Sequence, residues 1–389
     1  MTFEHFNSIK KILVMCLANP SNNPRPNRLI KLLHQKGYLV DTLAYKSNGD
    51  LNIFNEHVLR EPSLKITERL ARFSIKFIRL VLSNLDMKIK LTEKIYCLDK
   101  IKIDLKKYDL VIIENIELLP FAVRNNAKKI ICDLREFYPL EFESEWRFKI
   151  LESSFKYDLC KNYLKKCDEW VTVSTGLSKG YEEYFNIKPK VVMSTPYYYD
   201  IKPSINQEGK IRMVHHGVAN PDRKLENMIK MFYYLDERFF LDFYLVGNKK
   251  YISKLKEIAK PFQRIRFLEP VNYNDIIPTL NQYDIGVYLL EPTGFNTKYS
   301  LPNKFFEYIQ ARLMLAIGPT PDMKKICEQY KIGIVSNTFD PSELAEKLNK
   351  LSYNDILKYK ENADLAAKEL CFENESKKLI DIIEQLLMK

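Results

Sequence analysis

The sequence lacks any apolar run long enough to span a membrane. A spanning helix needs about 20 predominantly apolar residues, whereas the apolar run Ile12–Ala18 has only the length of a strand. The segment Met1–Lys10 also lacks the apolar centre of a secretory signal. We therefore expect a cytoplasmic chain that does not cross a membrane, although it can lie peripherally at the inner face of one.

Cysteine and recognisable metal ligands are also scarce. The seven cysteines form no CxxC pair, and the two closest are Cys160 and Cys167. A structural zinc site needs four ligands near one another, and an odd, scattered set is typical of reduced thiols. No Asp-x-Asp follows a predicted strand, and the adjacent His215 and His216 should point to opposite faces of one, with one buried and one exposed. We expect no bound metal and no cofactor.

Charge and length describe a soluble protein of two domains. The 389 residues exceed one ordinary core and fit two domains of roughly 150–200 residues. Lys and Arg number 61 against 50 Asp and Glu, a surplus of 11 positive charges. Such a surplus suits anionic partners, namely nucleic acid, an acidic membrane face or a phosphate-bearing substrate. Basic segments interleaved with aromatics are not evident, so nucleic acid is the partner we do not expect.

Short apolar runs alternate with longer amphipathic ones in both halves of the chain. Continuous apolar strands separated by helices are typical of parallel sheets covered on both faces. The fold class predicted is therefore α/β, with two doubly wound, Rossmann-like domains facing a cleft. The pattern breaks between Pro196 and Gly209, which reads as a linker. The predicted parts are an acceptor-side domain (1–198), a linker (199–209), a nucleotide-sugar-binding domain (210–370) and a C-terminal helix packing back on the first domain (371–389).

The segment Val214–Leu225 resembles a phosphate-binding turn. Its strand is expected to end at Gly217, with a helix starting near Pro221. Glycine allows close backbone approach to a ligand, and a helix N-terminus favours an anion. Arg223 and Lys224 place positive charge where the helix dipole disfavours it, which is explained if a phosphate binds there. An ordinary turn with two surface cations explains the segment about equally well.

A second informative segment, Leu301–Ile309, opens another helix. Pro302 is favourable near a helix start, and Lys304 and Glu307 share one face. In a binding site, Lys304 would contact a phosphate and Glu307 would accept hydrogen bonds from a ribose diol. The alternative is a surface ion pair.

Together these segments resemble the C-terminal domain of the GT-B glycosyltransferases, especially the retaining family four within glycosyl transferases group 1. That family has a strand ending in Gly, a basic residue, and "hydrophobic–Pro–x–Lys–hydrophobic–x–Glu" about 80 residues later. The resemblance implies donor binding by Gly217, Arg223, Lys224, Asn303, Lys304 and Glu307, with Asn296 and Thr297 facing the donor sugar. Family members often carry a second Glu where this chain has Tyr299.

The N-terminal half has two candidate loops after strands, where ligands of doubly wound sheets bind. Asn19 and Arg25 lie in a Pro- and Asn-rich loop and are expected on the acceptor side. Asp133, Arg135 and Glu136 occupy the place where the family reads "Asp–x–His–Glu", so the resemblance implies catalytic roles. Arg135 replaces the family's His. Asp133 serves equally well as a cap for the next helix.

Between Lys65 and Lys94, cations flank an apolar stripe at helical period. The stripe includes Leu70, Phe73 and Phe77, and the cations include Arg72 and Arg79. An amphipathic helix of this composition suits an anionic membrane surface. It is equally compatible with a helix whose apolar face packs on the core.

The function predicted is transfer of a sugar from a nucleoside-diphosphate sugar to a saccharide or lipid-linked saccharide, in surface polysaccharide assembly. This expectation follows from the resemblance. Two other functions fit the same features: a GT-B-shaped sugar-nucleotide epimerase, and a non-catalytic protein that binds polyanions or membranes. The donor base, the donor sugar, the acceptor and the stereochemical outcome are not indicated by the sequence.

Overall fold

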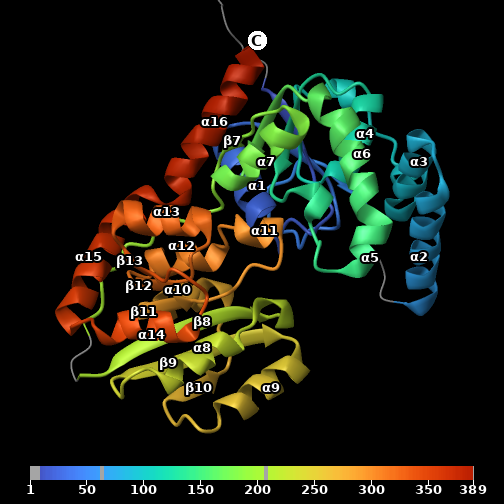
Figure 1. Ribbon diagram of the computed structural model, residues 1–389. Helices are drawn as coiled ribbons and strands as arrows, with labels where there is room; N and C mark the ends of the chain where they lie inside the picture. Colours follow the sequence, from blue (N-terminus) through green and yellow to red (C-terminus); the bar gives the residue numbers. More distant parts are fainter. Residues whose placement is uncertain (1–8, 62–64, 206–208, 389) are drawn as a thin grey trace, which may run out of the picture. The chain divides into compact units, whose positions relative to one another are not determined.

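The computed structural model describes residues 9–61, 65–205 and 209–388 (Figure 1). Most of the Met1–Lys10 segment and residues 206–208 of the predicted linker lie outside the described residues. Contacts within the chain define two units, Met1–Val192 with Lys378–Lys389, and Met193–Lys377. In the described residues, no helix combines the length and the apolar character that a membrane span requires.

The first unit is built on a parallel sheet that has seven strands in the described residues, in the order β3-β2-β1-β4-β5-β6-β7. The strands are β1 (Lys11–Met15), β2 (Leu39–Ala44), β3 (Glu56–Val58), β4 (Leu110–Ile113), β5 (Ile130–Leu134), β6 (Glu169–Thr172) and β7 (Lys190–Val191). The helices are α1 (Pro24–Gln35), α2 (Ile66–Val81), α3 (Leu85–Tyr96), α4 (Leu119–Arg124), α5 (Trp146–Phe148), α6 (Ser154–Tyr163) and α7 (Thr175–Phe185).

The second unit is built on a parallel sheet that has six strands in the described residues, in the order β10-β9-β8-β11-β12-β13. The strands are β8 (Ile211–Ala219), β9 (Phe239–Gly247), β10 (Ile265–Leu268), β11 (Ile285–Tyr288), β12 (Met314–Ile317) and β13 (Gly333–Val335). The helices are α8 (Glu226–Lys230), α9 (Lys249–Ala259), α10 (Ile276–Leu280), α11 (Phe295–Lys298), α12 (Asn303–Gln310), α13 (Pro321–Tyr330), α14 (Pro341–Asn349) and α15 (Tyr353–Glu369), with α16 (Phe372–Met388) running across the boundary.

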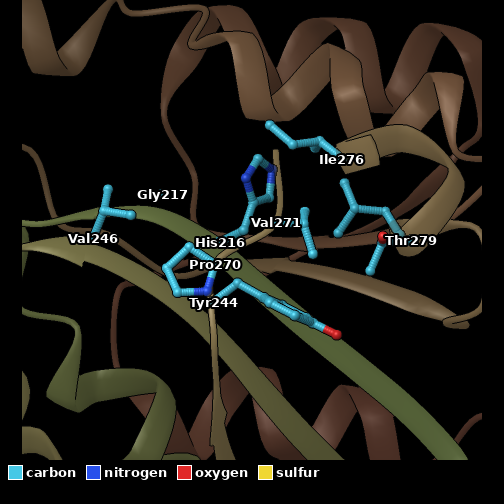
Figure 2. Close-up of a pocket in the computed structure, with 9 residues that line it drawn as sticks. His216, Gly217, Tyr244, Val246, Pro270, Val271, Ile276 and Thr279 are labelled. Atoms are coloured by element: carbon cyan, nitrogen blue, oxygen red, sulfur yellow. The ribbon is translucent and has the colours of Figure 1, made fainter. Parts of the chain in front are cut away.

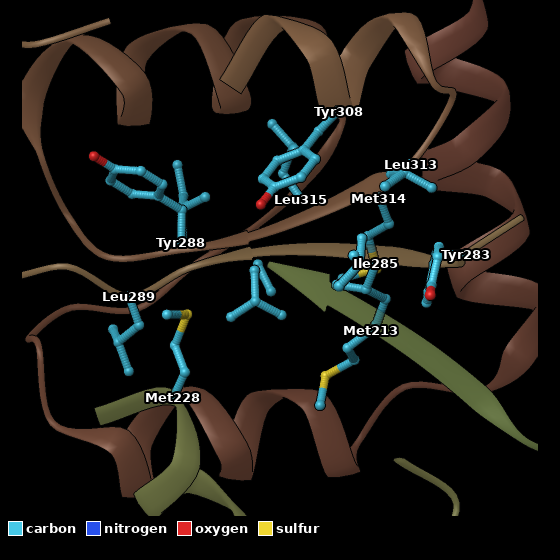
Figure 3. Close-up of a cluster of buried hydrophobic side chains, with 14 of the residues drawn as sticks. Met213, Met228, Tyr283, Ile285, Tyr288, Leu289, Tyr308, Leu313, Met314 and Leu315 are labelled. Atoms are coloured by element: carbon cyan, nitrogen blue, oxygen red, sulfur yellow. The ribbon is translucent and has the colours of Figure 1, made fainter. Parts of the chain in front are cut away.

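The two sheets form because their strands are apolar on both faces. Every residue of β4, β11 and β12 is buried, as the continuous apolar runs predict. Figure 3 shows the core of the second unit, where Met213, Ile285 and Met314 come from adjacent strands and Tyr308 comes from α12. The predicted α/β class with two doubly wound parallel-sheet units is therefore confirmed.

Both sheets reverse their strand order at one point, and this places the candidate sites. The reversal falls between β1 and β4 in the first unit, and between β8 and β11 in the second. Ligands of doubly wound sheets bind at the carboxyl ends of the strands beside such a switch point. Ligands are therefore expected at the loops after β1, β4, β8 and β11.

Several local expectations were wrong. The strand expected to end at Gly217 continues to Ala219. The helix expected near Pro221 is a single 3₁₀ turn, Pro221–Arg223, followed by the five-residue α8. A helix N-terminus is therefore not available there for a phosphate. The short edge strand β3 was not predicted, because its three residues are only partly covered.

Candidate functional site

The second unit gathers a lysine, two histidines and a glutamate beside its switch point. His215, His216 and Gly217 lie in β8, and Lys304 and Glu307 lie in the first turns of α12. Lys304 is only 6% exposed and Glu307 only 7% exposed. The alternative of a surface ion pair between these two residues is therefore wrong, since both side chains are buried.

Gly217 makes room for the ammonium group of Lys304. A Cβ atom at position 217 would lie 2.8 Å from Nζ of Lys304, and the backbone of Gly217 has φ +118°. Side chains rarely adopt that conformation, so the glycine serves both the turn and the close approach. The sequence had predicted both residues as donor ligands, and the structure brings them together.

His215 lies behind Lys304 and is completely buried. Its Nδ1 contacts the carbonyl of Val287 at 2.9 Å, and its Nε2 lies 3.4 Å from Nζ of Lys304. Because a carbonyl only accepts, Nδ1 carries the proton and Nε2 presents a lone pair to the lysine. Burial, followed by the charge of Lys304, holds the pKa of His215 well below its usual range.

His216 turns to the other side of β8 and meets Glu307. Its Nε2 lies 3.3 Å from Oε2 of Glu307, and its ring packs edge-on against Tyr308. Burial and then Lys304 lower the pKa of His216 to about 3, so the ring is neutral at pH 7. The expectation of one buried and one exposed histidine was wrong, because α12 covers His216 on the face expected to meet solvent.

Burial also changes Lys304 itself. It lowers the pKa of the ammonium to about 7, and the nearby charge of Arg223 acts in the same direction, while Glu307 opposes them. A lysine with this pKa is partly neutral at pH 7 in the free protein. An anion bound beside Lys304 would stabilise the ammonium form and raise its pKa again, so the lysine would be fully charged in the complex.

Arg223 and Lys224 lie in different environments. Arg223 ends the 3₁₀ turn and is half-buried, near enough to Lys304 to lower its pKa. Lys224 has φ 47° and pairs with Glu291 at 2.5 Å, with about half of its side chain exposed. Arg223 therefore joins the lysine cluster, whereas Lys224 is engaged in an ion pair on the surface.

The remaining predicted donor residues lie in the chain that leads into α12. Asn296 is buried in α11, and Asn303 accepts a hydrogen bond from the hydroxyl of Ser194 at 3.3 Å. The Thr297 hydroxyl accepts from the amides of Thr293 and Gly294. That hydroxyl caps its own short helix, so its visible role is to shape the loop.

A cavity of about 120 Å³ lies next to this cluster (Figure 2). It has a mostly apolar wall with two hydroxyl groups, from Tyr244 and Thr279. Its lining residues are His216, Gly217, Tyr244, Val246, Pro270, Val271, Ile276, Thr279 and Leu280. The Tyr244 hydroxyl contacts that of Tyr283 at 3.0 Å, and Tyr283 donates to Asp242 at 2.7 Å. A flat, largely apolar ring with polar edges fits such a cavity.

The first unit has a polar cluster at its own switch point. Arg25 contacts both oxygens of Asp133, from Nε at 2.5 Å and from Nη2 at 2.8 Å. Its Nη1 also donates to the carbonyl of Val192 at 3.2 Å. The alternative role of Asp133 as a helix cap is therefore not what the structure shows, because both of its oxygens face the guanidinium.

Arg135 is the more accessible cation of this cluster. Its Nη1 lies 3.5 Å from Oε2 of Glu114 and 3.4 Å from Oδ1 of Asn23. Glu136, the third predicted catalytic residue, is partly exposed. Asn19 accepts from the amide of Ser21 in its own loop, and its side-chain amide donates to Oδ1 of Asn48 in the loop after β2.

Glu114 was missed by the sequence analysis. It is completely buried directly after β4, and neither of its carboxyl oxygens has a hydrogen-bond partner among the described residues. Burial raises its pKa to about 7, against the opposing charge of Arg135. Its position just after an apolar strand was the available signal. His215 and Tyr244 were also not predicted as donor-site residues. His215 was considered only as a metal ligand, and nothing in the local sequence marks Tyr244.

Comparison with known proteins supports the architecture. Neither a protein-family model nor a curated protein sequence matches the chain. Among solved structures, the chain resembles sucrose-phosphate synthase from Thermosynechococcus elongatus, with 10% identity, a TM-score of 0.70, and 97% of this chain and 99% of that one covered. It also resembles WaaG, a glycosyltransferase involved in lipopolysaccharide biosynthesis, with 13% identity, a TM-score of 0.65, and coverage of 96% and 99%.

A third similar structure is Anabaena HepE in complex with UDP-glucose. It shares 12% identity with this chain at a TM-score of 0.66, and the match covers 96% of this chain and 99% of that one. The similarity extends over both units in all three cases. The fold is that of the GT-B glycosyltransferases. Within this GT-B fold, the lysine cluster lies at the switch point of the second unit, where the sequence had predicted donor binding.

Proposed function

We propose that this protein is a glycosyltransferase that moves a sugar from a nucleoside-diphosphate sugar to a saccharide or lipid-linked saccharide. The observation that carries the proposal is the position of Lys304, buried beside Gly217 at the switch point of a GT-B sheet. A buried ammonium next to a side-chain-free backbone is suited to an anion that approaches closely. A diphosphate is such an anion.

The residues around Lys304 suggest a complete donor site. Lys304 and Arg223 would bind the diphosphate, and Glu307 would accept hydrogen bonds from the ribose hydroxyls. The adjoining cavity of about 120 Å³ would receive the base, with Tyr244 and Thr279 offering hydroxyls to its edge. We propose a uridine nucleotide, since similar structures were solved with UDP and with UDP-glucose.

Catalysis in this proposal depends on stabilising the departing diphosphate. Negative charge grows on the leaving oxygen as the sugar bond breaks, and fixed cations lower the energy of that state. Lys304 and Arg223 would supply the charge, so we propose a reaction that needs neither a bound metal nor another cofactor. Arg135 would contact the transferred sugar or the acceptor at the first unit's switch point.

The stereochemical outcome determines whether a carboxylate is needed. An inverting reaction needs a general base, and Glu136 is the stronger candidate, because Asp133 is already held by Arg25. A retaining reaction on one face of the sugar needs no protein nucleophile. Arg135 would then contribute only by stabilising negative charge in the transition state. The variant Glu136→Gln distinguishes the inverting from the retaining mechanism, since it removes turnover only if the reaction inverts.

The acceptor is proposed to be lipid-linked, in surface polysaccharide assembly. The similarity to WaaG, a glycosyltransferase involved in lipopolysaccharide biosynthesis, supports this choice. So does the surplus of 11 positive charges, which suits work at an anionic membrane face. The protein would then be a cytoplasmic enzyme that associates peripherally with the inner face of the membrane.

Product analysis with a panel of UDP-sugars tests the proposal. The protein is incubated with each sugar nucleotide and a lipid-linked saccharide extract, and released UDP and labelled lipid are measured. Acceptor-dependent UDP release that is lost in Lys304→Ala supports glycosyl transfer. An epimerised sugar nucleotide formed without acceptor would instead indicate an epimerase. Absence of turnover with every donor, alongside salt-sensitive lipid binding, would indicate a non-catalytic protein.

A further inference from the structure

Helix α2 has its apolar face outside and an arginine inside. Within α2, Arg79 is the only buried residue, although the helix is strongly amphipathic. Leu70 is 61% exposed and Phe77 is 54% exposed. The exposed large apolar residues of this helix are Ile66, Leu70, Phe73, Phe77, Ile78, Leu80 and Val81. The interpretation of this segment as an ordinary core-facing helix is therefore wrong.

Arg79 holds the helix in this orientation. It pairs with Glu152, donates to the hydroxyl of Thr92 at 3.0 Å and to the carbonyl of Leu151 at 3.1 Å, and stacks 4.0 Å above the ring of Phe155. A buried guanidinium with this many partners fixes which face of α2 points inward. Arg79 is therefore not one of the membrane-facing cations that the sequence pattern suggested.

The segment from Phe142 to Ile150 lies beside α2 and adds further exposed apolar side chains to its surface. Phe142, Trp146 and Ile150 are each at least half exposed, and Trp146 is 64% exposed. A cavity of about 430 Å³ opens between this segment and α2. We call the exposed apolar residues of α2 together with these three residues the α2 surface. An exposed apolar area of this kind usually marks an interaction site.

The cavity in the α2 surface has a cationic lining. Arg69, Arg72, Lys76 and Arg147 face it, together with Glu145 and Glu152. Glu152 is already paired with both Lys76 and Arg79. The four cations of the lining therefore outnumber its two carboxylates, which gives the cavity a surplus of positive charge. Its aromatic wall comes from Phe73, Phe142 and Phe148.

We propose that the α2 surface docks on an anionic lipid bilayer and that the cavity receives a phosphate-bearing lipid headgroup. Guanidinium groups bind phosphate through paired hydrogen bonds. The surrounding Leu, Phe and Trp side chains would enter the boundary between headgroups and acyl chains. The inference rests on the proposed membrane-bound acceptor, and it assigns the surface and the lipid chemistry through which this chain reaches it.

Charge complementarity favours a lipid over a protein partner for this surface. Arg69, Arg72 and Lys76 recur every three or four residues along α2, so they form one cationic stripe beside the exposed apolar residues. An anionic bilayer offers negative charge on every side of an inserted apolar face. The centre of a protein interface is instead depleted of charged residues.

Sedimentation of the full-length protein with vesicles tests the inference. The vesicles contain either phosphatidylcholine alone or phosphatidylcholine with phosphatidylglycerol, and no nucleotide is added. One variant removes apolar contact (Leu70→Ser with Phe77→Ser), and another reverses charge (Arg69→Glu with Arg147→Glu). Matched controls change exposed residues of the second unit, Leu365→Ser and Lys254→Glu. Circular dichroism verifies that every variant is folded.

We expect binding to the anionic vesicles that weakens with added salt, and at least about tenfold weaker partition for each double variant. The controls should bind as the parent does. Absence of binding by the parent, unchanged binding by both variants, or equal binding to both vesicle types would overturn the inference. UDP titration of the same samples separates the two proposals, because retained nucleotide affinity without vesicle binding contradicts only the lipid surface.

Discussion

Nζ of Lys304 lies 3.4 Å from Nε2 of His215, whose Nδ1 donates to the carbonyl of Val287. Burial and the charge of Lys304 hold the pKa of this histidine well below its usual range, so the ring is neutral. A neutral Nε2 accepts a hydrogen bond from the ammonium and does not repel it. The contact fixes Lys304 over Gly217 in the absence of any ligand. The lysine is therefore positioned in advance, which lowers the cost of ordering it when an anion binds.

The affinity for UDP should fall as the pH rises from 7 to 9. Burial and Arg223 lower the pKa of Lys304 to about 7, so the free protein loses this charge above pH 7. A bound diphosphate raises that pKa again, and binding therefore takes up a proton. The expected loss is up to roughly tenfold per pH unit, and the nucleotide phosphate, with a pKa of about 6, is ionised throughout.

Calorimetry in buffers of different ionisation enthalpy measures this proton uptake directly. Lys304→Gln is the control, since it should remove both the uptake and most of the pH dependence. Equal affinity at pH 7 and pH 9, with no proton taken up, would show that Lys304 is not the group that meets the phosphate.

Gly217→Ala should weaken UDP binding by about tenfold or more. The new Cβ would lie 2.8 Å from Nζ of Lys304, at a backbone φ of +118°. One lost charge-assisted hydrogen bond corresponds to about 1.5–3 kcal/mol. The matched control is Gly49→Ala, where φ is +80° but no atom lies within 4 Å of the added group. Similar UDP affinity in both variants would contradict the close approach at Gly217.

Arg79→Met should destabilise the first unit by about 1.5–3 kcal/mol, because it removes the buried guanidinium that pairs with Glu152 and leaves the more exposed Lys76 as the ion-pair partner of that carboxylate. Arg69→Met, on the exposed part of the same helix, should change stability by less than about 0.5 kcal/mol. Urea unfolding followed by circular dichroism measures both. A small effect at Arg79 would mean that α2 is not anchored through this residue.

Glu114→Gln should flatten the pH dependence of stability. Burial raises the pKa of Glu114 to about 7 from its ordinary value of 4.5. The stabilising contribution of the protonated carboxyl is thus complete below pH 4.5 and is lost as the pH rises through 7. The parent should lose up to about 3 kcal/mol across this range. Urea unfolding between pH 5 and pH 8 tests this, and equal slopes in parent and variant would contradict it.

The fold was largely predictable because parallel strands buried on both faces leave continuous apolar runs. Central strands of the structure coincide closely with the apolar runs Ile12–Ala18, Ile285–Leu290 and Met314–Ile317. The family resemblance placed Gly217 and Lys304 in one set of donor ligands, and the structure brings the two residues together. Their role in binding a donor stays a prediction.

The rest depended on tertiary contacts that periodicity does not encode. The amphipathic pattern of α2 is the same whether its apolar face turns inward or outward, and the partners of Arg79 decide the outcome. Likewise, the burial of His216 follows from the position of α12, and Asp133 is paired with Arg25 from the first turn of α1, more than 100 residues away. Short elements such as β3 were missed for lack of a clear apolar run.

The central claim is that Lys304 anchors the diphosphate of a nucleotide, and calorimetric titration without added metal tests it most directly. UDP, GDP, CDP and ADP are each titrated into the parent, Lys304→Ala and the exposed control Lys254→Ala. We predict micromolar binding of UDP by the parent and the control. Affinity in Lys304→Ala should be lower by about 1.5–3 kcal/mol, roughly ten- to hundredfold. Binding of no nucleotide by the parent, or equal binding by Lys304→Ala, would contradict the account.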